Sequence, residues 1–117
     1  MDKVYEDTLL LDFYGQLLTE RQYEIMDLHF NNDYSLGEIA EQLNISRQGV
    51  YDSIKRGRAV LNRMEEKLGL VEKFVNQKSK AQKILNSIRS LDKSGVSEKD
   101  IMTLKRIEEG IIQIIEG

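Results

Sequence analysis

The sequence feature that most constrains the fold is an apolar stripe whose members alternate in steps of four and three residues. The stripe runs without a break to Gly69 through Val50, Ile54, Gly57, Leu61, Met64 and Leu68. Positions with this spacing share one face of an α-helix, so the stripe predicts a single helix of about 22 residues, roughly 33 Å long. Proline is absent from the chain, and nothing else in the composition interrupts helices. We therefore expect an all-α fold.

The segment SLGEIAEQLNISRQGVYDSI, between Ser35 and Ile54, has the pattern of a helix-turn-helix unit. Such a unit needs a short helix with a small inner residue, a tight turn, and a second helix whose first residues can enter a major groove. Ala40 is the small residue, and residues 44–46 form the expected turn. Ser35 and Ser46 precede the two helices as capping residues. A plain helical hairpin with the same periodicity is the alternative.

Two further helices are expected after this unit, over about 70–91 and from the capping residue Ser97 onward. The last one is strongly apolar, and that much apolar surface must be covered by this chain or by a second copy. We expect residues 1–68 to form a helix-turn-helix domain and residues 69–117 to form a helical extension used for dimerisation.

The composition argues against an enzyme. The chain has no cysteine and one histidine, which excludes the usual thiolate and imidazole metal sites, and it lacks the glycine-rich loops that hold nucleotide phosphates. We predict no catalytic residue and no cofactor. The first residues, MDKVYED, do not resemble a signal peptide, and no apolar run is long enough to cross a bilayer. We therefore expect a cytoplasmic protein without a membrane span.

Charge is divided sharply along the chain. Residues 1–45 carry ten acids and two bases, whereas residues 46–90 carry eleven bases and four acids. A basic region on an acidic protein favours a polyanionic partner, although opposite charges can also pair across packed helices or simply keep the surface hydrated.

The candidate nucleic-acid-binding residues follow the predicted turn on the second helix of the unit. They are Arg47, Gln48, Tyr51, Lys55, Arg56, Arg58 and Arg63. Arginine can bind guanine or phosphate, glutamine can read adenine, and lysine can hold the backbone. Asp52 would repel phosphate, so reading of a specific promoter is not favoured. RNA suits a basic helix slightly better, because its shape and backbone are recognised without base reading.

Parts of the sequence resemble known families. The stretches LTERQYEIMDLHF, YSLGEIAEQLNISRQGVYDSI and KRGRAVLNRMEEKL resemble region 4 of bacterial sigma factors. From YEDTLLLDFYGQLLTERQ through the basic helices, the chain more closely resembles the YlxM (p13-like) family. That resemblance implies a dimer with extra helices after the sigma-like unit. It also implies a regulatory role in the signal recognition particle pathway, because the family's genes lie beside those of the particle GTPase and its receptor.

Three functions follow as hypotheses. The first is a noncatalytic accessory protein that binds RNA or protein of the signal recognition particle, as a homodimer. The second is a DNA-binding transcriptional regulator, and the third is a protein-interaction scaffold that binds no nucleic acid.

Overall fold

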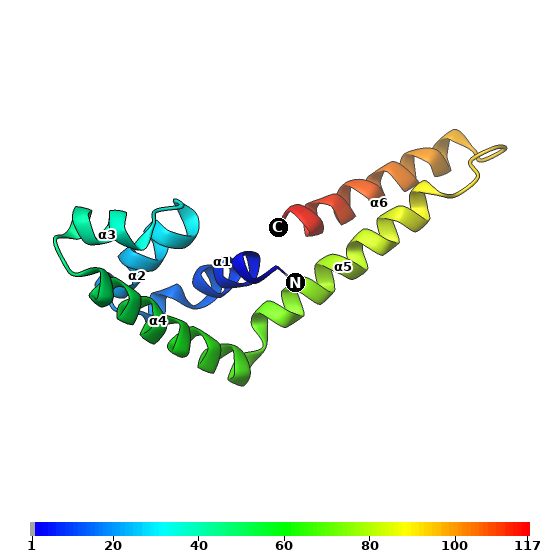
Figure 1. The fold of residues 1–117 in the computed structure, drawn as a ribbon. Helices are drawn as coiled ribbons and strands as arrows, with labels where there is room; N and C mark the ends of the chain where they lie inside the picture. Colours follow the sequence, from blue (N-terminus) through cyan, green and yellow to red (C-terminus); the bar gives the residue numbers. More distant parts are fainter. Residues whose placement is uncertain (1) are drawn as a thin grey trace. The chain divides into compact units, whose positions relative to one another are not determined.

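The computed structural model describes residues 2–117, and it contains helices and no β-strand among them (Figure 1). The predicted all-α fold is confirmed. The chain divides into two compact units, Met1–Val71 and Glu72–Gly117. The first unit contains α1 (Lys3–Tyr14), a 3₁₀ turn η1 (Gly15–Leu17), α2 (Glu20–Met26), a π-helical turn η2 (Asp27–Asn31), α3 (Leu36–Leu43) and α4 (Arg47–Leu68). The second contains most of α5 (Leu70–Arg89) and all of α6 (Glu98–Glu116).

The helices begin where the capping residues predict. The Thr19 hydroxyl accepts a hydrogen bond from the Gln22 amide at 3.1 Å, and the Gln22 side chain accepts one from the Thr19 amide. Ser97 caps α6 in the same way, because its hydroxyl accepts from the Asp100 amide at 3.2 Å. These contacts satisfy backbone groups that lack partners in the first turn of a helix.

The second helix changes its geometry before it ends. Regular α-helix ends at Met26 and widens into η2. Asn31 donates its side-chain amide to the Asp27 carboxylate at 2.8 Å, and Asn32 donates to the Asp27 backbone carbonyl at 3.1 Å. The Asn32 side chain therefore satisfies a backbone carbonyl at the start of this wider turn, while the bond from Asn31 joins two side chains one turn apart.

The core of the first unit lies along α4, which packs against α1, α2 and α3. The fully buried side chains are Leu11, Ile25, Met26, Ile39, Val50 and Leu61. Gly57 lies against the Met26 side chain of α2, because a methyl group at this position would overlap the Met26 sulfur. The absence of a side chain at Gly57 lets α4 lie directly on the Met26 side chain.

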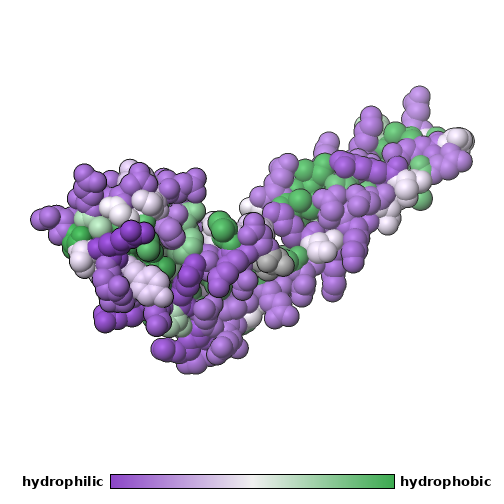
Figure 2. Space-filling view, in the orientation of Figure 1, coloured by the Kyte–Doolittle hydropathy of each residue, from purple (hydrophilic) through white to green (hydrophobic). Residues whose placement is uncertain are grey.

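The second unit is a helical hairpin. Ala81 and Leu85 of α5 form its core with Ile111 of α6. Three further isoleucines pack at the edge of this core, namely Ile88, Ile112 and Ile115. The last helix thus packs on α5 of its own chain. Apolar side chains nevertheless remain exposed on this hairpin, as the green residues over α5 and α6 in Figure 2 show.

Candidate nucleic-acid interface

The turn between α3 and α4 has the conformation that a helix-turn-helix requires. Asn44 adopts the left-handed conformation, with φ 55° and ψ 47°, and the Ile45 amide donates to the Ala40 carbonyl at 3.1 Å. Asparagine tolerates this conformation better than most residues with a side chain. Ser46 then caps α4 by accepting from the Gly49 amide at 2.9 Å. The turn therefore fixes the direction in which the first residues of α4 leave the core.

The start of α3 is held by a second capping box. The Ser35 hydroxyl accepts from the Glu38 amide, and the Glu38 carboxylate accepts from the Ser35 amide at 2.9 Å. The hydrogen bonds from the Ser35 backbone and hydroxyl lower the pKa of Glu38. Glu38 therefore stays ionised at the positive end of α3, where a carboxylate is favoured.

The predicted groove-facing residues lie at the exposed start of α4. Arg47 and Gln48 are exposed, and Tyr51 is 50% exposed. The Gln48 side-chain amide donates to the Asp52 carboxylate at 3.1 Å. This hydrogen bond occupies one donor that reading of adenine would require. It also holds the negative charge of Asp52 beside the residues that face the solvent.

Three of the candidate bases are exposed along the middle of α4, namely Lys55, Arg56 and Arg63. Arg56 and Arg63 are seven residues apart and so share a face of the helix. That face is opposite the stripe through Ile54 and Leu61, which is buried. The exposed side of α4 therefore presents cations to solvent over more than two helical turns.

Arg58 is placed differently from the other candidates. Its Nη2 lies 2.8 Å from the Asp7 carboxylate of α1, and its guanidinium carbon lies 5.1 Å from the centre of the Phe30 ring. The Asp7 side chain is 8% exposed, and a carboxylate that is so buried needs a cationic partner. Arg58 therefore neutralises a buried charge, and its side chain ties α4 to α1.

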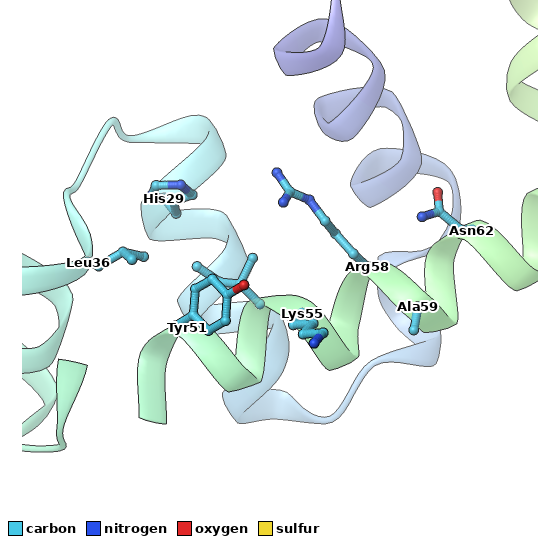
Figure 3. A pocket seen from close by; sticks show the side chains of 8 residues that line it. His29, Leu36, Tyr51, Lys55, Arg58, Ala59 and Asn62 are labelled. Carbon is cyan, nitrogen blue, oxygen red and sulfur yellow. The ribbon is translucent and has the colours of Figure 1, made fainter. Parts of the chain in front are cut away.

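A hollow of 440 Å³ opens beside this ion pair, between α4 and the segment that leads into α3 (Figure 3). Tyr51, Lys55, Ala59 and Asn62 line it from α4, together with Ile54 and Arg58, and His29 and Leu36 line it from the other side. The His29 Nδ1 lies 2.8 Å from the Tyr34 carbonyl oxygen, so Nδ1 carries the proton in this contact. The hollow combines two aromatic rings, an apolar floor, a lysine and an amide.

A polar network fixes the end of α4. The Tyr14 hydroxyl donates to the Glu65 carboxylate at 2.6 Å, and that carboxylate also accepts from the Val71 amide at 3.0 Å. The Leu70 amide donates to the Tyr14 oxygen at 3.2 Å. Burial raises the pKa of Tyr14, and the hydrogen bond to Glu65 raises it further. The first amides of α5 are thereby satisfied by side chains of α1 and α4.

Sequence reasoning did not identify His29 or Asn62 as parts of a site. The π-helical turn that carries His29 has no clear signal in the sequence. Asn62 could have been found, because it follows Tyr51 and Lys55 at helical spacing on α4.

Comparisons with known proteins define the family. A family model described as "Putative helix-turn-helix protein, YlxM / p13 like" (UPF0122) matches residues 1–103. The chain belongs to the UPF0122 family. A UPF0122 protein of Acetivibrio thermocellus is 70% identical over all 117 residues of both chains. The UPF0122 protein YlxM of Bacillus subtilis is 41% identical over 104 residues, which cover 89% of this chain and 91% of the relative.

Membership in UPF0122 confirms the resemblance to the YlxM family and the helix-turn-helix fold. The matched range includes the whole first unit, all of α5 and the beginning of α6. None of the helices in residues 2–117 is long and apolar enough to cross a membrane.

Proposed function

We propose that this UPF0122 protein is a noncatalytic, cytoplasmic accessory protein of the signal recognition particle pathway that binds RNA through α4. Membership in a helix-turn-helix family supports nucleic-acid binding. The choice of the signal recognition particle rests on the resemblance to the YlxM family, and the choice of RNA rests on the surface of α4.

The observation that carries the proposal is the charge at the start of α4. Each of the other five α-helices has an acidic residue in its first turn, whereas α4 has none and begins with Arg47 and Gln48. The N-terminus of a helix attracts anions through its free amides and its dipole, and an arginine there adds to this attraction. The helix that a helix-turn-helix presents to nucleic acid is thus the one prepared for phosphate.

Phosphate contact is favoured over base reading. Gln48 is hydrogen-bonded to Asp52, while Lys55, Arg56 and Arg63 are exposed. Among the residues that the structure describes, these three bases have no carboxylate within ion-pair distance. Such a surface recognises the shape and backbone of a nucleic acid, which is the usual mode for double-stranded RNA.

The test measures binding of the full chain to the signal recognition particle RNA of Acetivibrio thermocellus by fluorescence anisotropy at 50 and 200 mM salt. A DNA duplex of equal length and the particle GTPase are titrated in parallel. We expect the RNA to bind most tightly, with affinity falling steeply with salt. The variant with Arg56→Gln and Arg63→Gln should bind on the order of tenfold more weakly.

The matched control carries the same change of charge on exposed residues of α6, Lys99→Gln and Lys105→Gln, and it should bind like the parent. Equal weak binding to all three ligands would contradict the proposal. Tighter, sequence-selective binding to duplex DNA would favour a transcriptional regulator instead. Binding to the GTPase alone would favour a protein-interaction scaffold.

We also propose that the second unit forms a homodimer. Ile84, Met102, Ile107 and Ile114 are between 44% and 65% exposed on the hairpin. Exposed apolar residues gathered on two neighbouring helices mark an interaction surface. Sedimentation should show that the variant with Ile107→Glu and Ile114→Glu is monomeric, while Val4→Glu, an equally exposed position in α1, leaves the dimer intact. A parent protein that is monomeric at micromolar concentration would refute this proposal.

A further inference from the structure

The hollow beside α4 is a second feature of the nucleic-acid interface that the exposed arginines do not explain. Its volume of 440 Å³ lies within the range of about 300 to 1,000 Å³ that is typical of small-ligand sites. Four of its lining residues follow one another at helical spacing on α4, at positions 51, 55, 59 and 62. The hollow is therefore continuous with the surface that we propose binds RNA.

We propose that this hollow receives one unstacked nucleotide of the bound RNA strand. The proposal rests on the function proposed above and names the structural class of its ligand.

The walls provide the groups that recognise an unstacked base. The Tyr51 ring is half exposed at one wall, and the His29 ring lies at the wall formed by η2 (Figure 3). Aromatic side chains of this kind stack on bases that have left a helix. The buried Ile54 gives the hollow an apolar floor, the exposed Ala59 adds apolar lining, and Asn62 adds an amide that can donate to and accept from a base edge.

The charge of the hollow fits a phosphate within a strand. Arg58 is paired with Asp7, so its charge is already balanced. Lys55 is exposed and has no carboxylate within ion-pair distance among the described residues, which leaves one uncompensated cation at the rim. A phosphodiester carries one negative charge and matches Lys55. A free mononucleotide has a more highly charged terminal phosphate, which would be only partly neutralised.

The ligand is consequently an RNA with at least one unpaired nucleotide next to a helical segment. A base inside a continuous duplex stays stacked and paired, and moving it into a protein site costs free energy that a bulged base does not require. Arg56 and Arg63 would contact the phosphates of the helical segment, while the bulged nucleotide occupies the hollow.

The experiment compares two RNA hairpins that differ by a single bulged adenosine, with full-length protein and anisotropy as the readout. The parent should bind the bulged hairpin roughly five- to a hundredfold more tightly than the perfect one. Tyr51→Ala should remove this preference, because it should weaken binding of the bulged hairpin much more than binding of the perfect one. The control is Tyr5→Ala, because Tyr5 is 41% exposed on α1 and lies outside the hollow.

A second readout places 2-aminopurine at the bulge, because stacking on Tyr51 should quench its fluorescence in the parent and not in Tyr51→Ala. Circular dichroism checks that the variants are folded. Tyr51→Leu repeats the binding test with a side chain that keeps apolar contact but has no aromatic ring.

The outcomes distinguish failure of the nucleotide site from failure of the proposed RNA binding. Equal affinity of the parent for both hairpins would overturn the nucleotide site and leave the proposed RNA binding standing, as would an equal loss for both hairpins in Tyr51→Ala. Failure of both hairpins to bind would overturn both proposals. Binding of adenosine monophosphate as tightly as the bulged hairpin would overturn the assignment to a strand and indicate a free nucleotide.

Discussion

The close approach of α4 to α2 at Gly57 predicts a stability change of unusual sign. Replacing glycine by alanine inside a helix normally stabilises it by about 0.8 to 1.0 kcal/mol. At Gly57 the new methyl group would overlap the sulfur of Met26, whose side chain is 0% exposed and so can shift only by displacing other core side chains. Overpacking of a core costs about 1 to 3 kcal/mol. Gly57→Ala should therefore lower the free energy of unfolding by about 1 kcal/mol, the difference between these two effects.

The tyrosines make this prediction measurable in the full chain. All five lie between residues 5 and 51, within the first unit, so the tyrosine bands of the near-ultraviolet circular dichroism spectrum report on that unit alone. A loss of about 1 kcal/mol should lower the unfolding midpoint by roughly 4 to 8 °C for a unit of this size. Gly37→Ala is the matched control, because Gly37 is exposed near the start of α3 and its new methyl group would meet only ordinary contact. An increase in stability for both variants would refute the reasoning about Met26.

Three further changes test the first unit, each followed by urea unfolding with the same signal. Asp7→Asn should lower the free energy of unfolding by about 2 kcal/mol, which is less than the loss of a fully buried ion pair because Arg58 is partly exposed. Asp12→Asn on the surface of α1 should change this free energy little, and equal effects of the two variants would contradict the reasoning. The raised pKa of Tyr14 means that the folded state holds this proton more tightly than the unfolded state does. The free energy of unfolding should therefore be retained below pH 10 and fall as the pH rises above it. Tyr14→Phe should remove part of that fall, and a variant whose stability falls with pH as the parent's does would contradict this prediction. Asn44→Ala should lower the free energy of unfolding by about 1 kcal/mol, because the left-handed conformation at residue 44 strains the β-carbon of alanine. Asn44→Gly should leave it nearly unchanged, and equal losses in the two variants would contradict this reasoning.

Local signals in the sequence predicted much of the fold. The caps at Ser35, Ser46 and Ser97 were predicted because each involves a hydroxyl and an amide only three residues apart, so the neighbouring chain decides the contact. The turn at residues 44–46 was predicted for a similar reason, since a short connection after an apolar helix face leaves few alternatives. The long α4 followed from a periodic stripe that no proline interrupts.

Features that depend on contacts between distant residues could not be predicted in the same way. Arg58 was grouped with the other bases of α4, and nothing near it in the sequence indicates a partner 51 residues earlier in the chain. The hollow depends on the arrangement of η2 relative to α4, because its lining comes from both His29 of η2 and residues of α4. A sequence can identify exposed cations, but the fold decides which of them already have a partner.

The network around Tyr14 has a consequence for dividing the chain experimentally. A fragment that ends after Leu68 would lose the amides of Leu70 and Val71, and the Glu65 carboxylate would keep only its bond from Tyr14 among these contacts. A fragment that ends after Val71 would keep both amide donors. The second fragment should therefore be the better starting point for isotope-labelled studies of RNA binding, although the two differ by only three residues.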